Sequence, residues 1–203
     1  MTACAHLEST EEAHGDIRPY NIFACGDSEY KIVDPRLFSG GHLPFEYTLE
    51  SRLENKARHY SPLVFSCLGQ TSKKAPIQHD KYKSDVFSLG LTILEAVTLK
   101  NLEFVYNWKE HTIEMDKIKE ILKEQAEQKI YSTALIETIS LMLSVDEAQR
   151  PNFLKLDADL SLYRADIRTR TIKTEVKNHS CKQELISPFS MLVCTYSHTD
   201  RAE

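Results

Sequence analysis

The chain has 203 residues, enough for one globular domain, and its 41% hydrophobic and 27% charged residues are the proportions of an ordinary folded protein. A formal net charge of −5 and the lack of a basic stripe argue against nucleic acid as a main partner. The five scattered cysteines predict free thiols in a reducing compartment, and no segment resembles a secretion signal or a membrane span, so we expect a cytoplasmic protein with no membrane partner.

The N-terminal part of the chain predicts a short helix followed by a β-hairpin. Residues 2–13 are compatible with a helix that is polar on one face. Two apolar runs then follow, from Ile22 to Cys25 and from Tyr30 to Val33. The Gly-Asp-Ser-Glu sequence between them contains turn formers, so the two runs are typical of the paired strands of a hairpin.

Two carboxylates lie on either side of this hairpin. Asp16 precedes the first strand, Asp34 directly follows the second, and Asn21 lies between them. A hairpin brings its two ends together, and carboxylate and amide oxygens are ligands that Mg²⁺ and Ca²⁺ accept. The arrangement could therefore hold a divalent cation.

A long apolar stretch from Lys83 to Leu99 predicts a buried central helix. Its large apolar side chains cover all sides of the helical wheel, so a helix here has no face for solvent. Ser84 or Asp85 can cap its start. Taken alone, this stretch indicates a buried core helix and no particular function.

Three more helices are predicted in the C-terminal half. The patterns run from Thr112 to Gln128, from Ser132 to Ser144, and from Pro151 to about Ile167. Residues 168–203 begin as a polar, aperiodic stretch, which favours a flexible tail. Apolar residues between Leu185 and Val193 leave open the alternative that this tail covers an exposed face as a lid.

Four short motifs occur in order along the chain. They are H-G-D-I-R-P-Y-N-I from His14, K-I-V-D-P-R-L-F from Lys31, D-V-F-S-L-G from Asp85 and L-M-L-S-V-D-E-A-Q-R-P-N-F from Leu141. The first two resemble the catalytic loop and metal-binding segment of protein kinases, in the serine/threonine-type form His-Arg-Asp-Leu-Lys-Pro-x-Asn and Asp-Phe-Gly. The other two resemble the kinase Asp-x-Trp-Ser-x-Gly and Asp-x-x-x-Arg-Pro motifs. The sequence is thus similar to the protein kinase superfamily over roughly residues 13–163.

The resemblance implies a fold as well as a site. We expect a mainly α structure with a small β-hairpin, corresponding to the C-terminal lobe of the protein kinase-like fold, over residues 1–167. Within it, the resemblance implies a catalytic loop at 14–22, an activation segment at 34–63 and the central helix at 83–99. Only about a dozen residues precede the first motif, so we expect the N-terminal lobe to be absent from this chain.

The resemblance also assigns roles to individual residues. Asp16 would orient the substrate hydroxyl and accept its proton, and Arg18 stands where the family has a lysine that steadies the transferred phosphoryl group. Asn21, which belongs to the same catalytic loop, and Asp34 would hold magnesium between the phosphates of ATP. The implied cofactors are Mg²⁺ and ATP if the chain is active, and none if it is not.

Several departures from the family pattern are typical of a degenerate, pseudokinase-like domain. Gly15 replaces the arginine that reads activation-loop phosphorylation, and Pro35 and Arg36 replace Phe-Gly. Leu63 replaces the glutamate that pairs with the arginine matching Arg150. Because an unpaired buried arginine is costly, we expect Arg150 either to find another partner or to lie nearer solvent.

Three functions remain open at this point. The first is a catalytically impaired binding or scaffold module with a protein partner on the face that the N-terminal lobe normally covers. The second is the C-terminal part of an ATP- and Mg-dependent serine/threonine kinase whose N-terminal lobe is missing from this chain. The third is a structural component of a larger assembly. The sequence names no substrate, partner or pathway.

Overall fold

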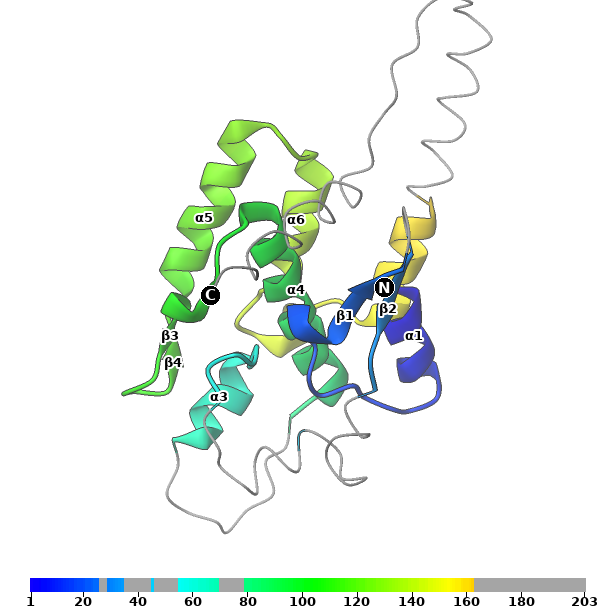
Figure 1. Cartoon of the computed structure of the whole chain (residues 1–203), viewed down its shortest axis with the longest axis horizontal. Coiled ribbons are helices and arrows are strands. Elements are labelled where there is room, and N and C mark those ends of the chain that lie inside the picture. Colours follow the sequence, from blue (N-terminus) through cyan, green and yellow to red (C-terminus); the bar gives the residue numbers. More distant parts are fainter. Residues whose placement is uncertain (26–28, 35–44, 46–54, 70–78, 163–203) are drawn as a thin grey trace, which may run out of the picture.

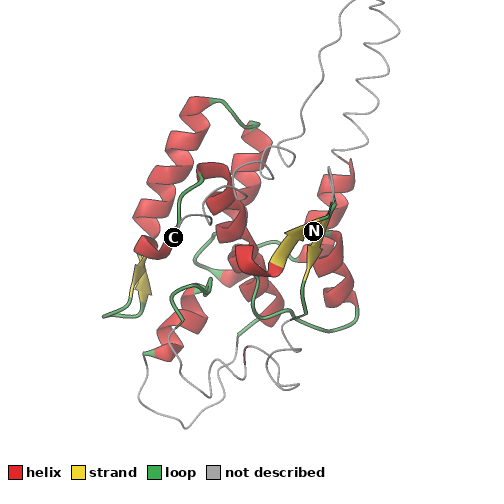
Figure 2. Cartoon of the chain, in the orientation of Figure 1, coloured by secondary structure: helices red, strands yellow, loops and turns green. Residues whose placement is uncertain are grey.

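Helix α4 (Lys81–Thr98) runs through the centre of the computed structural model, which describes residues 1–25, 29–34, 45, 55–69 and 79–162 (Figure 1). Most residues of α4 are buried and the others are half-buried, as expected from a helix with apolar side chains all round. The described residues are mainly helical, with two small antiparallel sheets (Figure 2). The predicted fold class is therefore confirmed at this level.

The ends of α4 differ from the prediction. Asp80 is the N-cap, and its carboxylate accepts hydrogen bonds from the backbone N–H groups of Tyr82 and Lys83 at 3.0 Å. Ser84 and Asp85 are instead buried inside the helix, so the predicted cap was wrong. Leu99 has a left-handed backbone with φ of 54° and is 63% exposed, so it ends the helix instead of packing in the core.

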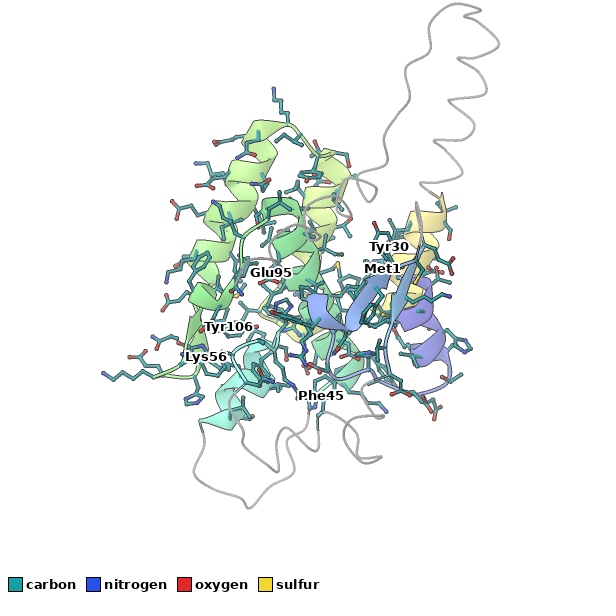
Figure 3. All side chains as sticks on the ribbon, in the orientation of Figure 1. Met1, Tyr30, Phe45, Lys56, Glu95 and Tyr106 are labelled. Atoms are coloured by element: carbon teal, nitrogen blue, oxygen red, sulfur yellow. The ribbon has the colours of Figure 1, made fainter. Side chains whose placement is uncertain are left out.

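One side of α4 carries the larger hydrophobic core. It packs against α3 (Pro62–Leu68), α5 (Met115–Gln128), α6 (Thr133–Met142) and the 3₁₀ turn η3 (Glu103–Val105). Aromatic rings gather here, because the Phe65 ring centroid lies 4.9 Å from that of Tyr106 and 5.0 Å from that of Trp108, both edge to face. Figure 3 labels Tyr106 next to α3, where this cluster fills the core.

The other side of α4 packs against the two ends of the described chain. Helix α1 (Thr2–Ser9) and the helix at 153–162 contribute to a second core cluster together with the β1–β2 hairpin (Figure 1). The Glu8 carboxylate accepts a hydrogen bond from the backbone N–H of Phe153 at 2.7 Å, and Thr2 donates one to Asp157 at 2.8 Å. The helix predicted from Pro151 thus exists but begins two residues later, with Asn152 accepting from the backbone N–H of Lys155.

The predicted hairpin is confirmed, and a second strand pair appears. Strand β1 (Ile22–Ala24) pairs antiparallel with β2 (Tyr30–Ile32). Strand β3 (Tyr106–Asn107) pairs with β4 (Thr112–Ile113). The helix predicted to start at Thr112 therefore starts three residues later, because Thr112 and Ile113 complete a strand pair that a local helical pattern does not reveal.

Two short 3₁₀ turns lie near the ends of the described chain, and parts of two predicted segments lie outside the described residues. The 3₁₀ turns η1 (Pro19–Asn21) and η4 (Glu147–Gln149) lie within the first and the last of the four motifs. Of the predicted activation segment 34–63, residues 35–44 and 46–54 lie outside the described residues, and so does the predicted tail. Among the residues that are described, no helix is long and apolar enough to cross a membrane.

Gly90 of α4 packs closely against the end of α6. A Cβ atom at this position would lie 3.0 Å from Leu143 Cδ2 and 3.0 Å from Met142 Cβ. We expect Gly90→Ala to lower the free energy of unfolding by about 1 kcal/mol, because overpacking costs about 1–3 kcal/mol and outweighs the smaller helix-propensity gain of alanine. Thermal unfolding of the two proteins measures this difference, and a higher melting temperature for the variant would contradict it.

Candidate functional site

A buried carboxylate on α4 holds the start of the first motif. The backbone N–H of His14 donates to Asp85 Oδ2 at 2.6 Å, and that of Gly15 donates to Asp85 Oδ1 at 2.8 Å. Asp85 is 1% exposed, and burial raises its pKa to about 7, although the two N–H bonds oppose this rise. The loop is therefore fixed to a buried position on the central helix.

Gly15 and His14 set the direction of the loop. Gly15 has φ of 76°, a left-handed conformation that glycine adopts at no steric cost. His14 Nδ1 accepts a hydrogen bond from the backbone N–H of Asp16 at 3.2 Å. Its Nε2 lies 2.6 Å from the carbonyl oxygen of Val33, so Nε2 carries the proton and donates to it. This histidine thus joins the loop to the end of β2.

The Asp16 carboxylate is surrounded by donors. Its Oδ1 lies 3.2 Å from Arg18 Nε and 3.3 Å from Arg58 Nε. Its Oδ2 accepts a hydrogen bond from Asn21 Nδ2 at 3.0 Å, and the same amide donates to the backbone carbonyl of Asp16 at 2.7 Å. The structure therefore brings three of the four predicted site residues, Asp16, Arg18 and Asn21, into one cluster.

Arg58 is the member of this cluster that sequence reasoning missed. It lies 42 positions after Asp16 and belongs to none of the four motifs. It comes from the stretch just before α3, which also places the backbone N–H of Tyr60 2.8 Å from the hydroxyl of Tyr106. The only available signal was its place near the end of the predicted activation segment, which the kinase resemblance puts close to the catalytic loop.

Asp34, the fourth predicted site residue, lies just past the end of β2. It lines a pocket of about 210 Å³ between α1 and the hairpin, together with His6, Leu7, His14 and Ile32. Within the ranges that the structure describes, no group of three or more His, Cys, Asp or Glu side chains is arranged to hold a metal ion. Pro35 and Arg36, which depart from the family pattern, lie outside these ranges.

Arg150 of the last motif is buried and binds other partners in place of the missing glutamate. This confirms the first of the two expectations for Arg150, another partner, and not a position nearer solvent. It is 3% exposed, and its guanidinium donates to the backbone carbonyls of Ser144 at 2.6 Å, Val145 at 2.9 Å and Lys83 at 3.1 Å. It also lies 5.0 Å from the centre of the Phe87 ring. Burial lowers its pKa, and the three carbonyls replace the missing glutamate as acceptors.

Comparison with known proteins decides the family. Residues 1–160 match the family model described as protein tyrosine and serine/threonine kinase. The chain belongs to this kinase family. The resemblance inferred from four motifs is thereby confirmed, and the match covers α1, the loop around Asp16, the hairpin and α4 to α6.

Individual kinases are similar over most of this chain. The membrane-associated tyrosine- and threonine-specific cdc2-inhibitory kinase wee-1.3 of Caenorhabditis elegans is 32% identical over 154 residues, which cover 74% of this chain and 20% of that protein. The serine/threonine-protein kinase Nek4 of Mus musculus is 29% identical over 182 residues, covering 87% of this chain and 21% of that protein. This kinase-family chain therefore spans about a fifth of the length of these relatives.

Proposed function

We propose that this kinase-family chain is the C-terminal lobe of a kinase-like fold and acts as a catalytically impaired binding or scaffold module. The observation that carries the proposal is the occupied carboxylate of Asp16. Arg18 and Arg58 contact one oxygen, and Asn21 donates to the other. In kinases the equivalent aspartate must accept a hydrogen bond from the substrate hydroxyl. Here a substrate hydroxyl would have to share this carboxylate with the three side chains that already contact it.

The proposed partner is a protein that covers the face next to the hairpin. Tyr20 is 75% exposed and Phe23 is 54% exposed, and both lie at the start of the β1–β2 hairpin. In a complete kinase fold the second lobe covers this region. Two exposed aromatic rings offer the type of contact that protein interfaces favour.

A second candidate function is the C-terminal part of an ATP- and Mg-dependent serine/threonine kinase. It is favoured by the contact between Asp16 and Asn21, because these are the loop residues that phosphoryl transfer needs. The Asn21 nitrogen faces Asp16, which leaves its amide oxygen for a metal ion, and Asp34 would supply a carboxylate. Both are oxygen ligands that suit Mg²⁺. Bound MgATP would supply the phosphoryl group, and the residues that cover its phosphates would come from outside these 203 residues.

Nucleotide binding separates the two candidates. For the impaired module, we expect no change in melting temperature when millimolar ATP and Mg²⁺ are added to the purified chain. A ligand at about 100 times its dissociation constant would stabilise the folded state by about 2.7 kcal/mol, which a thermal scan detects readily. The Asp34→Asn variant is the control for the metal site.

The opposite outcome would overturn the impaired module. A shift that needs Mg²⁺ and is lost in Asp34→Asn would mean that the site holds nucleotide, and the second candidate would replace the first. A shift that persists in Asp34→Asn would place nucleotide elsewhere on the domain, and it would contradict the role given to Asp34 in the second candidate.

A further inference from the structure

The His59 side chain lies between α4 and the stretch that leads into α3. It belongs to residues 55–61, and its side chain is 8% exposed. Its Nδ1 lies 3.0 Å from Thr92 Oγ1 and 3.3 Å from the carbonyl oxygen of Ser88, both on α4. Its Nε2 lies 3.4 Å from Oε2 of Glu95, further along the same helix (Figure 3). Both ring nitrogens therefore face oxygen atoms of one helix.

The neighbouring groups determine which nitrogens of His59 carry hydrogen. The Ser88 carbonyl only accepts, and Thr92 donates its single hydroxyl hydrogen to that carbonyl at 2.9 Å. Nδ1 must therefore donate to Thr92. The Glu95 carboxylate also only accepts, and its other oxygen, Oε1, accepts from the backbone N–H of Leu102 at 2.7 Å. The contact with Glu95 thus requires hydrogen on Nε2 as well, and a ring with hydrogen on both nitrogens is a cation.

A neutral His59 ring would satisfy only part of this arrangement. With hydrogen on Nδ1 alone, the lone pair of Nε2 would face the Glu95 carboxylate. With hydrogen on Nε2 alone, the Thr92 hydroxyl would have to turn from Ser88 to Nδ1, and Nδ1 would still lie 3.3 Å from the Ser88 carbonyl oxygen. Histidine changes charge between about pH 5 and pH 8. Loss of one proton in this range would therefore weaken a contact between the stretch and α4.

Glu95 is the charged side chain that the described part of α4 places against this ring. Strand β3 presents the hydroxyl of Tyr106, which donates to the Tyr60 carbonyl at 2.9 Å and accepts from the Tyr60 N–H at 2.8 Å. Burial raises the pKa of Tyr106 well above its usual value of about 10, so this hydroxyl stays neutral where histidine changes charge. The pH response of this contact therefore comes from His59 and Glu95.

Two other charged side chains of the stretch contact different elements. Arg58 Nε lies 3.3 Å from Asp16 Oδ1 in the candidate site, and Lys56 Nζ lies 3.6 Å from Glu103 Oε1 on η3. Because Arg58 is next to His59 in the sequence, the attachment of His59 to α4 also affects the position of Arg58 at the candidate site.

We propose that protonated His59 and Glu95 form a pH-sensitive latch that holds residues 55–61 on α4, closed near pH 6 and looser at pH 8. The inference does not depend on which of the two candidate functions is correct, because it concerns the attachment of this stretch. Ser88 Oγ donates to the His59 carbonyl at 2.6 Å, so the stretch stays near α4 when the latch loosens. The latch makes the position of Arg58 at the candidate site depend on pH.

Hydrogen exchange of the Tyr60 amide in the complete 203-residue chain tests the latch. This N–H is buried and donates to Tyr106, so it exchanges only when the stretch opens. NMR gives its protection factor, the intrinsic exchange rate divided by the measured rate, at pH 6 and pH 8. The protection factor of Ile121 in α5 is the reference for effects of pH on the whole fold. We expect the ratio of Tyr60 to Ile121 to be about threefold higher at pH 6 than at pH 8, the size of one ion pair.

Three variants make the result specific. Glu95→Gln keeps the size of the side chain and an acceptor oxygen but removes the charge, so it should abolish the pH dependence of the ratio. His59→Gln has no proton to lose in this range and should abolish it too. His6→Gln is the matched control, because it removes an exposed histidine from α1 and should leave the pH dependence unchanged.

Several results would overturn the inference. Equal ratios at pH 6 and pH 8 in the unaltered chain would contradict it, as would a full pH dependence in Glu95→Gln or its loss in His6→Gln. If Glu95→Gln fails to fold, the comparison of His59→Gln with His6→Gln decides the matter. These failures are distinct from failure of the proposed function, because the MgATP experiment measures nucleotide binding.

Discussion

The Arg150→Met variant is expected to lower the free energy of unfolding by about 3 kcal/mol. Methionine fills most of the same volume, so the variant removes mainly the hydrogen bonds and the charge. The half-buried carbonyls of Ser144, Val145 and Lys83 would lose a charged donor, and a hydrogen bond to a charged group contributes about 1.5–3 kcal/mol. Relief of the buried positive charge offsets part of this loss. Urea denaturation followed by circular dichroism measures the difference.

Arg150→Lys is the matched control for this prediction. Lysine keeps a positive charge but has one ammonium group in place of the planar fork, so it cannot reach three carbonyls in the same geometry. We expect its stability to lie between those of the methionine variant and the unaltered chain. A methionine variant as stable as the unaltered chain would show that burial of the charge costs as much as the three hydrogen bonds contribute.

The sequence allowed the elements near α4 to be predicted well, because their signals are local. Apolar side chains on all sides of the helical wheel from Lys83 onward predict a buried helix. The structure places this helix, α4, at Lys81–Thr98. The turn formers between two apolar runs predict the β1–β2 hairpin, which has the expected antiparallel pairing. The motif that begins at His14 placed Asp16, Arg18 and Asn21 in one loop, and their side chains meet in this loop.

The features that were missed depend on contacts between distant parts of the chain. The strand residues Thr112 and Ile113 look helical in sequence, and only their pairing with Tyr106 and Asn107 makes them a strand. Arg58 contacts Asp16 although the two residues are 42 positions apart in the sequence, and no local pattern predicts this contact. Propensity and periodicity describe neighbours in sequence, so such contacts are beyond their reach.

The Asp85→Ala variant is expected to lower the free energy of unfolding at pH 8 by about 2–4 kcal/mol. The buried backbone N–H of His14 and the half-buried N–H of Gly15 would lose their acceptors. Because these bonds hold the loop that carries Asp16, amide hydrogen exchange at Gly15 should accelerate more than exchange in α5. Asp85→Asn keeps one acceptor oxygen and should show about half of the effect. Unchanged exchange at Gly15 in the alanine variant would contradict the anchoring role of Asp85.

The same variants should respond to pH in a defined direction. Burial raises the pKa of Asp85 from 3.8 to about 7, so between these values the folded chain binds a proton that the unfolded chain does not. The contribution of Asp85 to stability is therefore greatest below pH 4, falls as pH rises toward 7 and is constant above that. The cost of Asp85→Asn should thus be larger at pH 5 than at pH 8, by at least about 1.4 kcal/mol, the equivalent of one pKa unit. Urea denaturation at pH 5, 6, 7 and 8 measures this trend.

An equal cost at every pH would mean that Asp85 of the folded chain is ionised over this whole pH range. The two N–H donors would then outweigh the effect of burial on its pKa.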